Sequence, residues 1–237
     1  MKLYFSPAAC SLSPHILLRE CGLTFDLEKV DTELHRTADG RDFYAINPKG
    51  QVPVLELADG SRITEGPVIA QYIADQAQAT ELMPAAGTLA RYRVMEWQNY
   101  VSTELHKSFT PLFHAGLDDT AKATLAALLR KKMDWLDAQL QHGPYLTGEH
   151  FTAADAYLFV VLGWAKFVKL DISDLAHLQA FLRRVAARMD ALQFKIEGAG
   201  EEVRPVTRAG RRLLLRCGPR GRLRLRRPTS RPCRSRP

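Results

Sequence analysis

The chain has 237 residues, of which 46% are hydrophobic and 25% are charged, and its formal net charge at pH 7 is +7. This length is sufficient for one large or two small domains with a proper core. No run of about 18 apolar residues occurs, and the first residues resemble a strand rather than a signal peptide, so we expect no membrane span and no leader. The four cysteines, at positions 10, 21, 217 and 233, form no C-x-x-C pair. We therefore expect a protein of the reducing cytoplasm.

The positive charge is concentrated at the C-terminal end of the chain. Residues 204–237 contain 13 arginines and no Lys, Asp or Glu, whereas residues 1–203 hold 20 basic and 26 acidic residues. Because this Arg-rich tail has no aromatic residue and cannot bury enough apolar surface, we expect it to be disordered. Its Arg, Pro, Gly and Ser bias also fits out-of-frame translation of a GC-rich gene. Nucleic-acid binding through the tail is disfavoured, because the rest of the chain is acidic.

The first third of the chain predicts alternating strands and helices. The predicted strands are 1–5, 25–30, 54–57 and 61–63, and the predicted helices begin near Pro14, at 42–46 and at Thr64 as N-cap. Asp59-Gly60 has the form of a two-residue hairpin turn between the last two strands. The predicted order is therefore βαβαββα.

The rest of the chain predicts helices only. Residues 76–87 are rich in Ala, Gln, Pro and Gly and have little periodicity, as expected for a linker. The predicted helices are 89–113, 120–140, one that starts at Thr152 with a capping box to Asp155, and 175–192. We predict a first domain at 1–77, a linker at 78–87, an all-helical domain at 88–200 and the tail at 204–237.

Cys10 is the strongest candidate for chemistry, because it lies between the first strand and the start of the first helix. Helix N-termini stabilise anions, so the thiolate is favoured and its pKa is expected to fall. Ser13 stands where a dithiol oxidoreductase carries its second cysteine, so Cys10 can form a mixed disulfide but cannot resolve it internally. The alternative is a buried free cysteine that acts as a small hydrophobe.

Five sequence blocks together resemble the cytosolic glutathione transferases, and more narrowly their bacterial beta class. The blocks are M-K-L-Y-F-S-P-A-A-C-S-L-S-P-H, N-P-K-G-Q-V-P-V-L, T-E-G, N-Y-V-S-T-E-L-H-K and F-T-A-A-D-A-Y-L-F. The resemblance runs from Met1 to about Gly198. It implies a thioredoxin-like N-terminal domain followed by an all-helical C-terminal domain, glutathione as co-substrate, no metal and a cytoplasmic homodimer that acts in detoxification.

The resemblance also implies where glutathione binds. Pro53 matches a cis-proline that presents the Val52 backbone to the cysteinyl part, and Glu65 and Gly66 match the pair that receives the γ-glutamyl end. Helix amides and a carboxylate suit the carboxylate and ammonium at that end. Many beta-class members carry a lysine at position 35 for the glycyl carboxylate. This chain has His35, so we expect a weaker, pH-sensitive contact there. Arg36 is the alternative cation at this point, and the sequence leaves that alternative open.

Further site residues are implied along the first helix of the second domain. The resemblance places six residues near glutathione, some of them from the partner subunit: Asn99, Thr103, Glu104, Leu105, His106 and Lys107. Asn99, Thr103 and His106 are spaced to share one helix face. Catalysis is assigned to Cys10 and His106, with Ser11 as a neighbouring donor.

Four aromatic residues are candidates for the pocket of the electrophilic substrate: Phe109, Phe113, Trp164 and Phe167. Core packing is the competing interpretation of all four. For Thr152 and Asp155 we prefer the structural role of a helix cap.

The predicted function is conjugation of reduced glutathione to small electrophilic molecules, with Cys10-dependent thiol transfer as a second activity. The alternative is a non-catalytic protein that binds glutathione or a hydrophobic ligand. The sequence does not identify the electrophile, because several chemistries share one scaffold.

Overall fold

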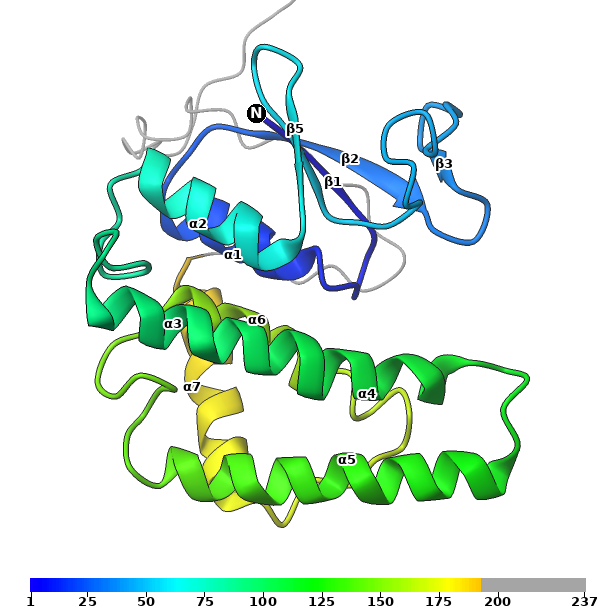
Figure 1. Cartoon of the computed structure of the whole chain (residues 1–237), viewed down its shortest axis with the longest axis vertical. Helices are drawn as coiled ribbons and strands as arrows, with labels where there is room; N and C mark the ends of the chain where they lie inside the picture. The colour runs from blue at the N-terminus through cyan, green and yellow to red at the C-terminus, as the bar shows by residue number, and fades with distance from the viewer. Residues whose placement is uncertain (193–237) are drawn as a thin grey trace, which may run out of the picture. The chain divides into compact units, whose positions relative to one another are not determined.

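Residues 1–192 are described by a computed structural model, and their N-terminal part is a five-stranded mixed sheet (Figure 1). The strands are β1 (Lys2–Phe5), β2 (Asp26–Asp31), β3 (Arg36–Thr37), β4 (Val54–Glu56) and β5 (Arg62–Thr64). Their order in the sheet is β3-β2-β1-β4-β5. Only β1 and β2 run parallel, and α1 (Leu12–Glu20) connects them, whereas the other neighbours are antiparallel.

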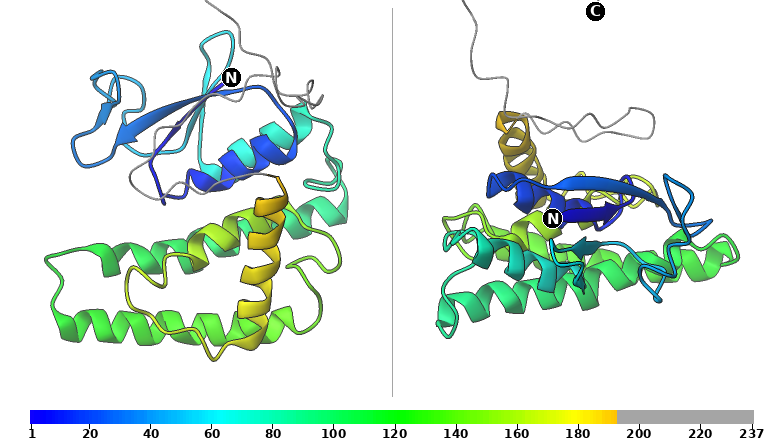
Figure 2. Two further views of the ribbon diagram at one scale, coloured as in Figure 1. Left: turned by 180° about the vertical axis from the view of Figure 1, so that it is seen from behind. Right: turned by 90° about the horizontal axis from the view of Figure 1, so that it is seen from above.

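Alternation along the strands divides the side chains between two apolar clusters. Leu3 and Leu55 are fully buried on the face covered by α1 and α2 (Gly66–Gln76) (Figure 2). Tyr4 and Val54, one position away, are fully buried in a smaller cluster on the opposite face. Successive side chains of a strand point to opposite faces, so one strand contributes to both clusters.

The predicted helix at 42–46 is absent, and turns take its place. The Phe43 carbonyl accepts the N–H groups of Ile46 at 3.0 Å and Asn47 at 2.8 Å. Five residues are too few for a stable helix, and Pro48 ends any continuation. Phe43 and Ile46 are nevertheless buried, so the apolar residues of this segment complete the smaller cluster without a helix.

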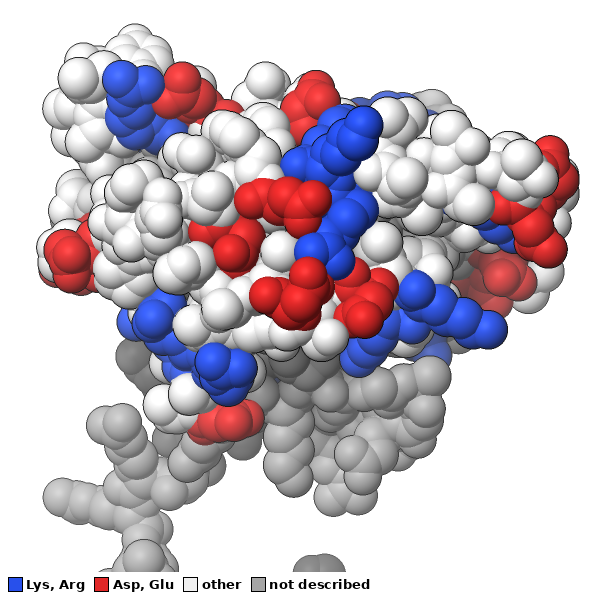
Figure 3. All heavy atoms as spheres, turned by 90° about the horizontal axis from the view of Figure 1, so that it is seen from below, with Lys and Arg blue, Asp and Glu red and all other residues white. Residues whose placement is uncertain are grey.

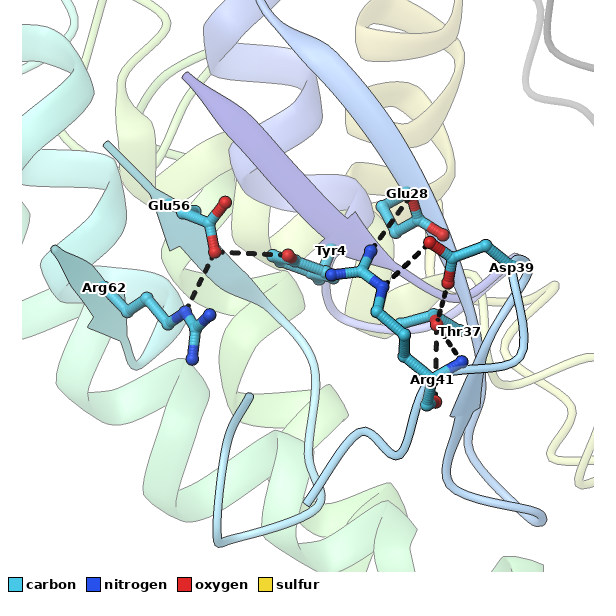
Figure 4. A network of polar contacts seen from close by, with 7 residues as sticks. All are labelled: Tyr4, Glu28, Thr37, Asp39, Arg41, Glu56 and Arg62. Carbon is cyan, nitrogen blue, oxygen red and sulfur yellow. Dashed lines mark hydrogen bonds and ion pairs between the residues drawn. The ribbon is translucent and has the colours of Figure 1, made fainter. Parts of the chain in front are cut away.

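A network of polar side chains borders the smaller cluster (Figure 4). The Tyr4 hydroxyl donates to Glu56 at 3.2 Å, and Arg62 Nε donates to the same Glu56 oxygen at 2.9 Å. On the other side, Arg41 pairs with Asp39 at 2.8 Å. Because both charges of each pair stay near water, this border satisfies polar groups at the edge of the sheet and adds little stability.

The remaining elements are helical. A nearly continuous rod consists of α3 (Leu89–Tyr100), a π-helical segment η1 (Val101–His106), α4 (Lys107–Phe109) and a 3₁₀ segment η2 (Thr110–Phe113) (Figure 1). It is followed by α5 (Asp119–Leu140), α6 (Ala153–Leu162) and α7 (Ala176–Ala191). The predicted helices are thus confirmed, and no helix or strand lies between Gln76 and Leu89, where the linker was predicted.

The sheet half and the helical half share one core. The larger apolar cluster extends from Leu3 in β1 to Phe181 in α7, and α1 packs against α6. Across the same boundary, Trp164 Nε1 donates to the Ala8 carbonyl at 2.7 Å, and Arg188 pairs with Glu20. The fold class, a thioredoxin-like domain followed by a helical domain, is confirmed.

Two sequence predictions fall on other parts of the chain. The Arg-rich tail and the end of the predicted second domain lie outside the described residues, and the domain limits at 77 and 88 stay a prediction. Within residues 1–192, no helix is sufficiently long and apolar to cross a membrane.

Candidate active site

A cavity of about 380 Å³ lies between the sheet half and the helical half. The residues that line it come from both sides. The sheet half contributes Ala9, Cys10, Thr32, His35, Asn47, Lys49, Gly50, Gln51, Val52, Pro53, Thr64, Glu65, Gly66 and Pro67, and the helical half contributes Ser102, His106, Lys107, Thr110 and Tyr157. Eight of the predicted site residues are among them: Cys10, His35, Val52, Pro53, Glu65, Gly66, His106 and Lys107.

The loop that carries Cys10 is fastened at both ends. The buried Ser11 hydroxyl accepts the Ser6 N–H at 3.1 Å and donates to the Ser6 carbonyl at 3.2 Å. Ala8 has a left-handed backbone (φ 58°), and its carbonyl is bound by Trp164. The Ser11 hydroxyl therefore holds the loop closed and does not line the cavity, whereas the Ser11 backbone N–H acts on the Cys10 thiol and lowers its pKa. A catalytic role of Ser11 stays a prediction.

The Cys10 thiol is held as a neutral group in the empty cavity. Its Sγ donates to the Val52 carbonyl at 3.4 Å. Burial raises the pKa of Cys10 to about 11, although the backbone N–H groups of Cys10 and Ser11 and the charge of Lys107 act in the opposite direction. The expected fall in this pKa is therefore wrong for the empty site, because desolvation of the thiolate outweighs stabilisation by the helix end.

Two backbone features bracket the cavity floor. The Val52–Pro53 peptide bond is cis, as the resemblance implies. Glu65 has a left-handed backbone (φ 67°) and occupies the N-cap position of α2, so the predicted cap at Thr64 is displaced by one residue. Gly66 then begins the helix with its N–H group at the positive end of the helix dipole.

The Glu65 carboxylate is paired with Lys49 in this empty state. Lys49 Nζ lies 2.5 Å from Glu65 Oε1 and 2.8 Å from Thr64 Oγ1. The two charged side chains are 48% and 65% exposed, and ion pairs of this kind contribute about 0.2–1 kcal/mol. The pair is therefore easily exchanged for another partner.

His35 is fixed by two neighbours. Its Nδ1 lies 3.2 Å from the Gly50 carbonyl, and its ring packs against the tilted ring of Tyr44 with a centroid distance of 4.4 Å. Gly50 permits this approach, because a Cβ there would lie 2.6 Å from Tyr44 and 2.9 Å from His35. A carbonyl only accepts hydrogen bonds, so the proton of a neutral imidazole is on Nδ1, and Nε2 carries a lone pair.

On the helical side, His106 and Tyr157 meet across the cavity wall. His106 Nδ1 lies 2.6 Å from the Tyr157 hydroxyl, and the His106 ring packs edge-on against Trp164 at 4.7 Å. Burial and the neighbouring Lys107 lower the pKa of His106 to about 4, so the imidazole is neutral at pH 7. Burial also raises the pKa of Tyr157, which keeps the phenol protonated and available as a donor.

Several predicted site residues lie elsewhere in this chain. Asn99 and Thr103 are exposed outside the cavity lining, Glu104 pairs with Lys132 at 3.0 Å, and Leu105 is buried in the core. Of the predicted face of Asn99, Thr103 and His106, His106 alone lines this cavity, and the contacts of Asn99 and Thr103 with glutathione stay a prediction. Residues four apart, Ser102, His106 and Thr110, line the cavity instead, along the π-helical segment and the turn after it.

Three of the four aromatic candidates, Phe109, Phe113 and Trp164, are in ring contact with one another through Trp164. Phe109 and Trp164 are buried, and Phe113 and Trp164 have ring centroids 6.1 Å apart. Phe113 and Phe167 are 50% and 55% exposed. None of the four lines the cavity described above, so core packing accounts for Phe109 and Trp164.

Sequence reasoning did not single out Lys49, Ser102 or Tyr157. All three lie inside blocks that carried the resemblance, N-P-K-G-Q-V-P-V-L, N-Y-V-S-T-E-L-H-K and F-T-A-A-D-A-Y-L-F, so position within those blocks was the available signal. Within residues 1–192, no cluster of three or more His, Cys, Asp or Glu residues is placed to hold a metal ion.

Two family models match the chain. The model of the glutathione S-transferase N-terminal domain matches residues 8–76, and that of the C-terminal domain matches residues 119–184. Glutathione S-transferase GstA of Escherichia coli O157:H7 is 47% identical over 188 residues, which is 79% of this chain and 94% of that protein.

Solved structures give the same result. A ternary complex of BphK, a bacterial GST, has a TM-score of 0.78 and 50% identity, and the match covers 81% of this chain and 96% of that one. A sphingomonad glutathione S-transferase complexed with glutathione has a TM-score of 0.76 and 41% identity, with 82% and 100% covered.

Proposed function

This chain belongs to the glutathione S-transferase family and conjugates glutathione to electrophilic small molecules, and we propose that the cavity beside Cys10 holds the reacting glutathione. The observation that carries this proposal is the shared lining: Cys10, the cis Val52–Pro53 turn and the start of α2 face one cavity together. Each of these three features can bind one part of the tripeptide, respectively the sulfur, the cysteinyl backbone and the γ-glutamyl end.

The proposed pose follows the polar groups along the cavity. Glu65 binds the α-ammonium of glutathione, and the Gly66 N–H with the α2 dipole binds the α-carboxylate. The Val52 backbone pairs with the cysteinyl residue, which brings the glutathione sulfur beside Cys10. The Tyr157 hydroxyl, together with neutral His106, lies across the cavity from this sulfur and can donate a hydrogen bond to a thiolate.

In the conjugation step, the glutathione thiol loses its proton to water, and the thiolate sulfur attacks the electrophilic carbon. A carbon–sulfur bond forms, and the leaving group departs with the electron pair of the bond that breaks. Cys10 contributes its S–H as a hydrogen-bond donor, which a thiol with a raised pKa retains at pH 7.

We also propose thiol transfer through Cys10. Its thiolate attacks a disulfide that contains glutathione, which gives a Cys10–glutathione mixed disulfide and releases one thiolate. Cys21, the other cysteine within residues 1–192, does not line the cavity, and in this proposal a second glutathione resolves the mixed disulfide. A non-catalytic ligand carrier is the alternative, and it would bind glutathione without turnover.

Partners and location remain part of this proposal. We propose a cytoplasmic homodimer, in which exposed Asn99 and Thr103 and partly buried Glu104 approach the cavity of the second subunit. Nucleic acid is not a proposed partner. On the face drawn in Figure 3, basic and acidic side chains are interspersed, which does not make the single-sign surface that phosphate backbones require.

The test is replacement of Cys10 by alanine, with Cys21→Ala as the matched control. We expect conjugation to a chromogenic electrophile to fall by no more than about tenfold, the effect of one lost hydrogen bond to a charged group. Thiol–disulfide exchange should disappear in Cys10→Ala and persist in Cys21→Ala. Exchange that persists in Cys10→Ala, or no turnover by the wild type in either assay, would reject the proposal.

A further inference from the structure

The ammonium group of Lys49 occupies the place beside Glu65 where the ammonium group of the ligand is proposed to bind. The Lys49 ammonium group is paired with Glu65 and Thr64 in the empty cavity. Among residues 1–192, Glu65 is the only acidic residue that lines this cavity. A ligand that brings an ammonium group into the cavity therefore competes with Lys49 for the Glu65 carboxylate.

The charges of glutathione provide a new partner for the Lys49 that its ammonium group displaces. Glutathione carries one ammonium group and two carboxylates at pH 7. Once its ammonium group pairs with Glu65, and its α-carboxylate with the start of α2, the glycyl carboxylate still lacks a cation. The displaced Lys49 is then a cation without a partner.

His35 does not supply this charge in its neutral form. Because Nδ1 donates to the Gly50 carbonyl, the second nitrogen of a neutral ring presents a lone pair, which repels a carboxylate. Lys49 directly precedes Gly50 in the chain, so its backbone lies at the His35 end of the cavity while its side chain extends to Glu65. A lysine has a long flexible stem and reaches more than one point from such a position.

We propose that Lys49 exchanges partners when glutathione binds: it leaves Glu65 to the ligand's ammonium group and pairs with the glycyl carboxylate. This inference rests on the proposed binding of glutathione in this cavity and names a residue that determines its specificity. Lys107, the other lysine of the lining, comes from the helical half, and its charge lowers the pKa of Cys10, so it acts on the sulfur end of the ligand.

The test compares glutathione with its glycine monoethyl ester, which lacks the glycyl charge, by titration calorimetry in the presence of a phosphine reductant. The wild type should bind the acid about fivefold more tightly than the ester, the effect of one partly exposed ion pair. In Lys49→Met this preference should disappear, and the affinity for the ester should stay equal or increase, because Glu65 has lost its competing partner. Lys131→Met, an exposed lysine on α5, is the matched control and should retain the wild-type preference.

Each outcome is decisive. A Lys49→Met variant that keeps the preference for the acid overturns the inference, and so does one that loses both ligands equally while Lys49→Arg retains both. A wild type that binds acid and ester equally also overturns it. A wild type that binds neither ligand would instead reject the proposed glutathione site itself.

Discussion

At the scale of single residues, desolvation decides the protonation of the cavity. Cys10 has two backbone N–H groups and a lysine that favour its thiolate, yet burial raises its pKa to about 11. The same cause lowers the pKa of His106 to about 4. Both groups are therefore neutral at pH 7 before ligand enters, so Cys10 and His106 offer hydrogen bonds at the sulfur position, and Lys107 is the positively charged side chain of the lining that acts there.

The protonation of His106 gives a prediction for acid stability. Its pKa is about 6.5 in the unfolded chain and about 4 in the folded one, so the unfolded state takes up a proton first as the pH falls. The stability associated with neutral His106 is present above pH 6.5 and is lost between pH 6.5 and 4, by about 2 kcal/mol near pH 5. Urea unfolding near pH 7 and pH 5 should show a smaller decrease for His106→Gln than for the wild type.

An exposed histidine is the control for this measurement. His142→Gln, at the end of α5, should show the same decrease between the two pH values as the wild type. An equal decrease in His106→Gln and the wild type would contradict the assignment of a buried neutral imidazole.

Sequence reasoning located the site residues that lie beside a backbone feature the sequence itself reveals, such as the end of a strand, a proline or the start of a helix. Cys10 follows a strand, Val52 precedes a proline, and Glu65 precedes the first residue of a helix, so each side chain or backbone group could be assigned to one place. Tyr157 could not be recognised in this way. It lies in α6, which is buried almost all round and therefore has no polar stripe that would show which side faces the cavity.

At the scale of elements, two aspartates at helix N-termini show how burial changes the contribution of a capping hydrogen bond to stability. Asp118 caps α5 with one hydrogen bond from the Ala121 N–H at 2.9 Å, at the surface. Asp155, fully buried, accepts the N–H groups of Leu146 and Thr152 and the Thr152 hydroxyl, each at 2.8 Å. Burial raises the pKa of Asp155 to about 6, which works against these three bonds.

We predict that the three hydrogen bonds of Asp155 stabilise the fold by more than the desolvation of its carboxylate destabilises it. Asp118→Ala should lower the free energy of unfolding by about 1 kcal/mol, as is usual for an exposed cap. Asp155→Ala should lower it by about 3 kcal/mol or more, because three buried donors lose their acceptor. Urea denaturation monitored by circular dichroism measures both. An Asp155→Ala variant as stable as Asp118→Ala would indicate that the desolvation of the carboxylate cancels its hydrogen bonds.

Helices with a long stretch of periodically spaced apolar residues could be predicted from the sequence. Segments whose conformation depends on tertiary packing could not. The capping box at Thr152 and the helices at α5 and α7 are apparent from local sequence. The segment 42–46 has the composition of a helix, but its conformation is set by the packing of Phe43 and Ile46 in the smaller cluster. The π-helical segment η1 has no local signal, and it shifts which residues of the rod face the cavity.

At the scale of residues 1–192 as a whole, the site exists because two structurally different halves share one core. The sheet half supplies the cysteine and the proposed glutathione contacts, and the helical half supplies His106 and Tyr157. The bond from Trp164 to Ala8 joins the halves at the loop that carries the thiol. The order of the two halves could be predicted from the sequence, whereas this junction joins residues 156 positions apart and required the structure.

The measurement that tests the central claim most directly is the intact mass of the protein after incubation with oxidised glutathione at mildly alkaline pH. The account predicts a gain of one glutathionyl group that a reductant removes, with peptide mapping that places it on Cys10. In a Cys217→Ser/Cys233→Ser background, which removes the two cysteines outside residues 1–192, Cys10→Ala should show no such gain and Cys21→Ala should retain it. An adduct that persists in Cys10→Ala, or a wild type that forms none, would contradict the claim that glutathione binds with its sulfur beside Cys10.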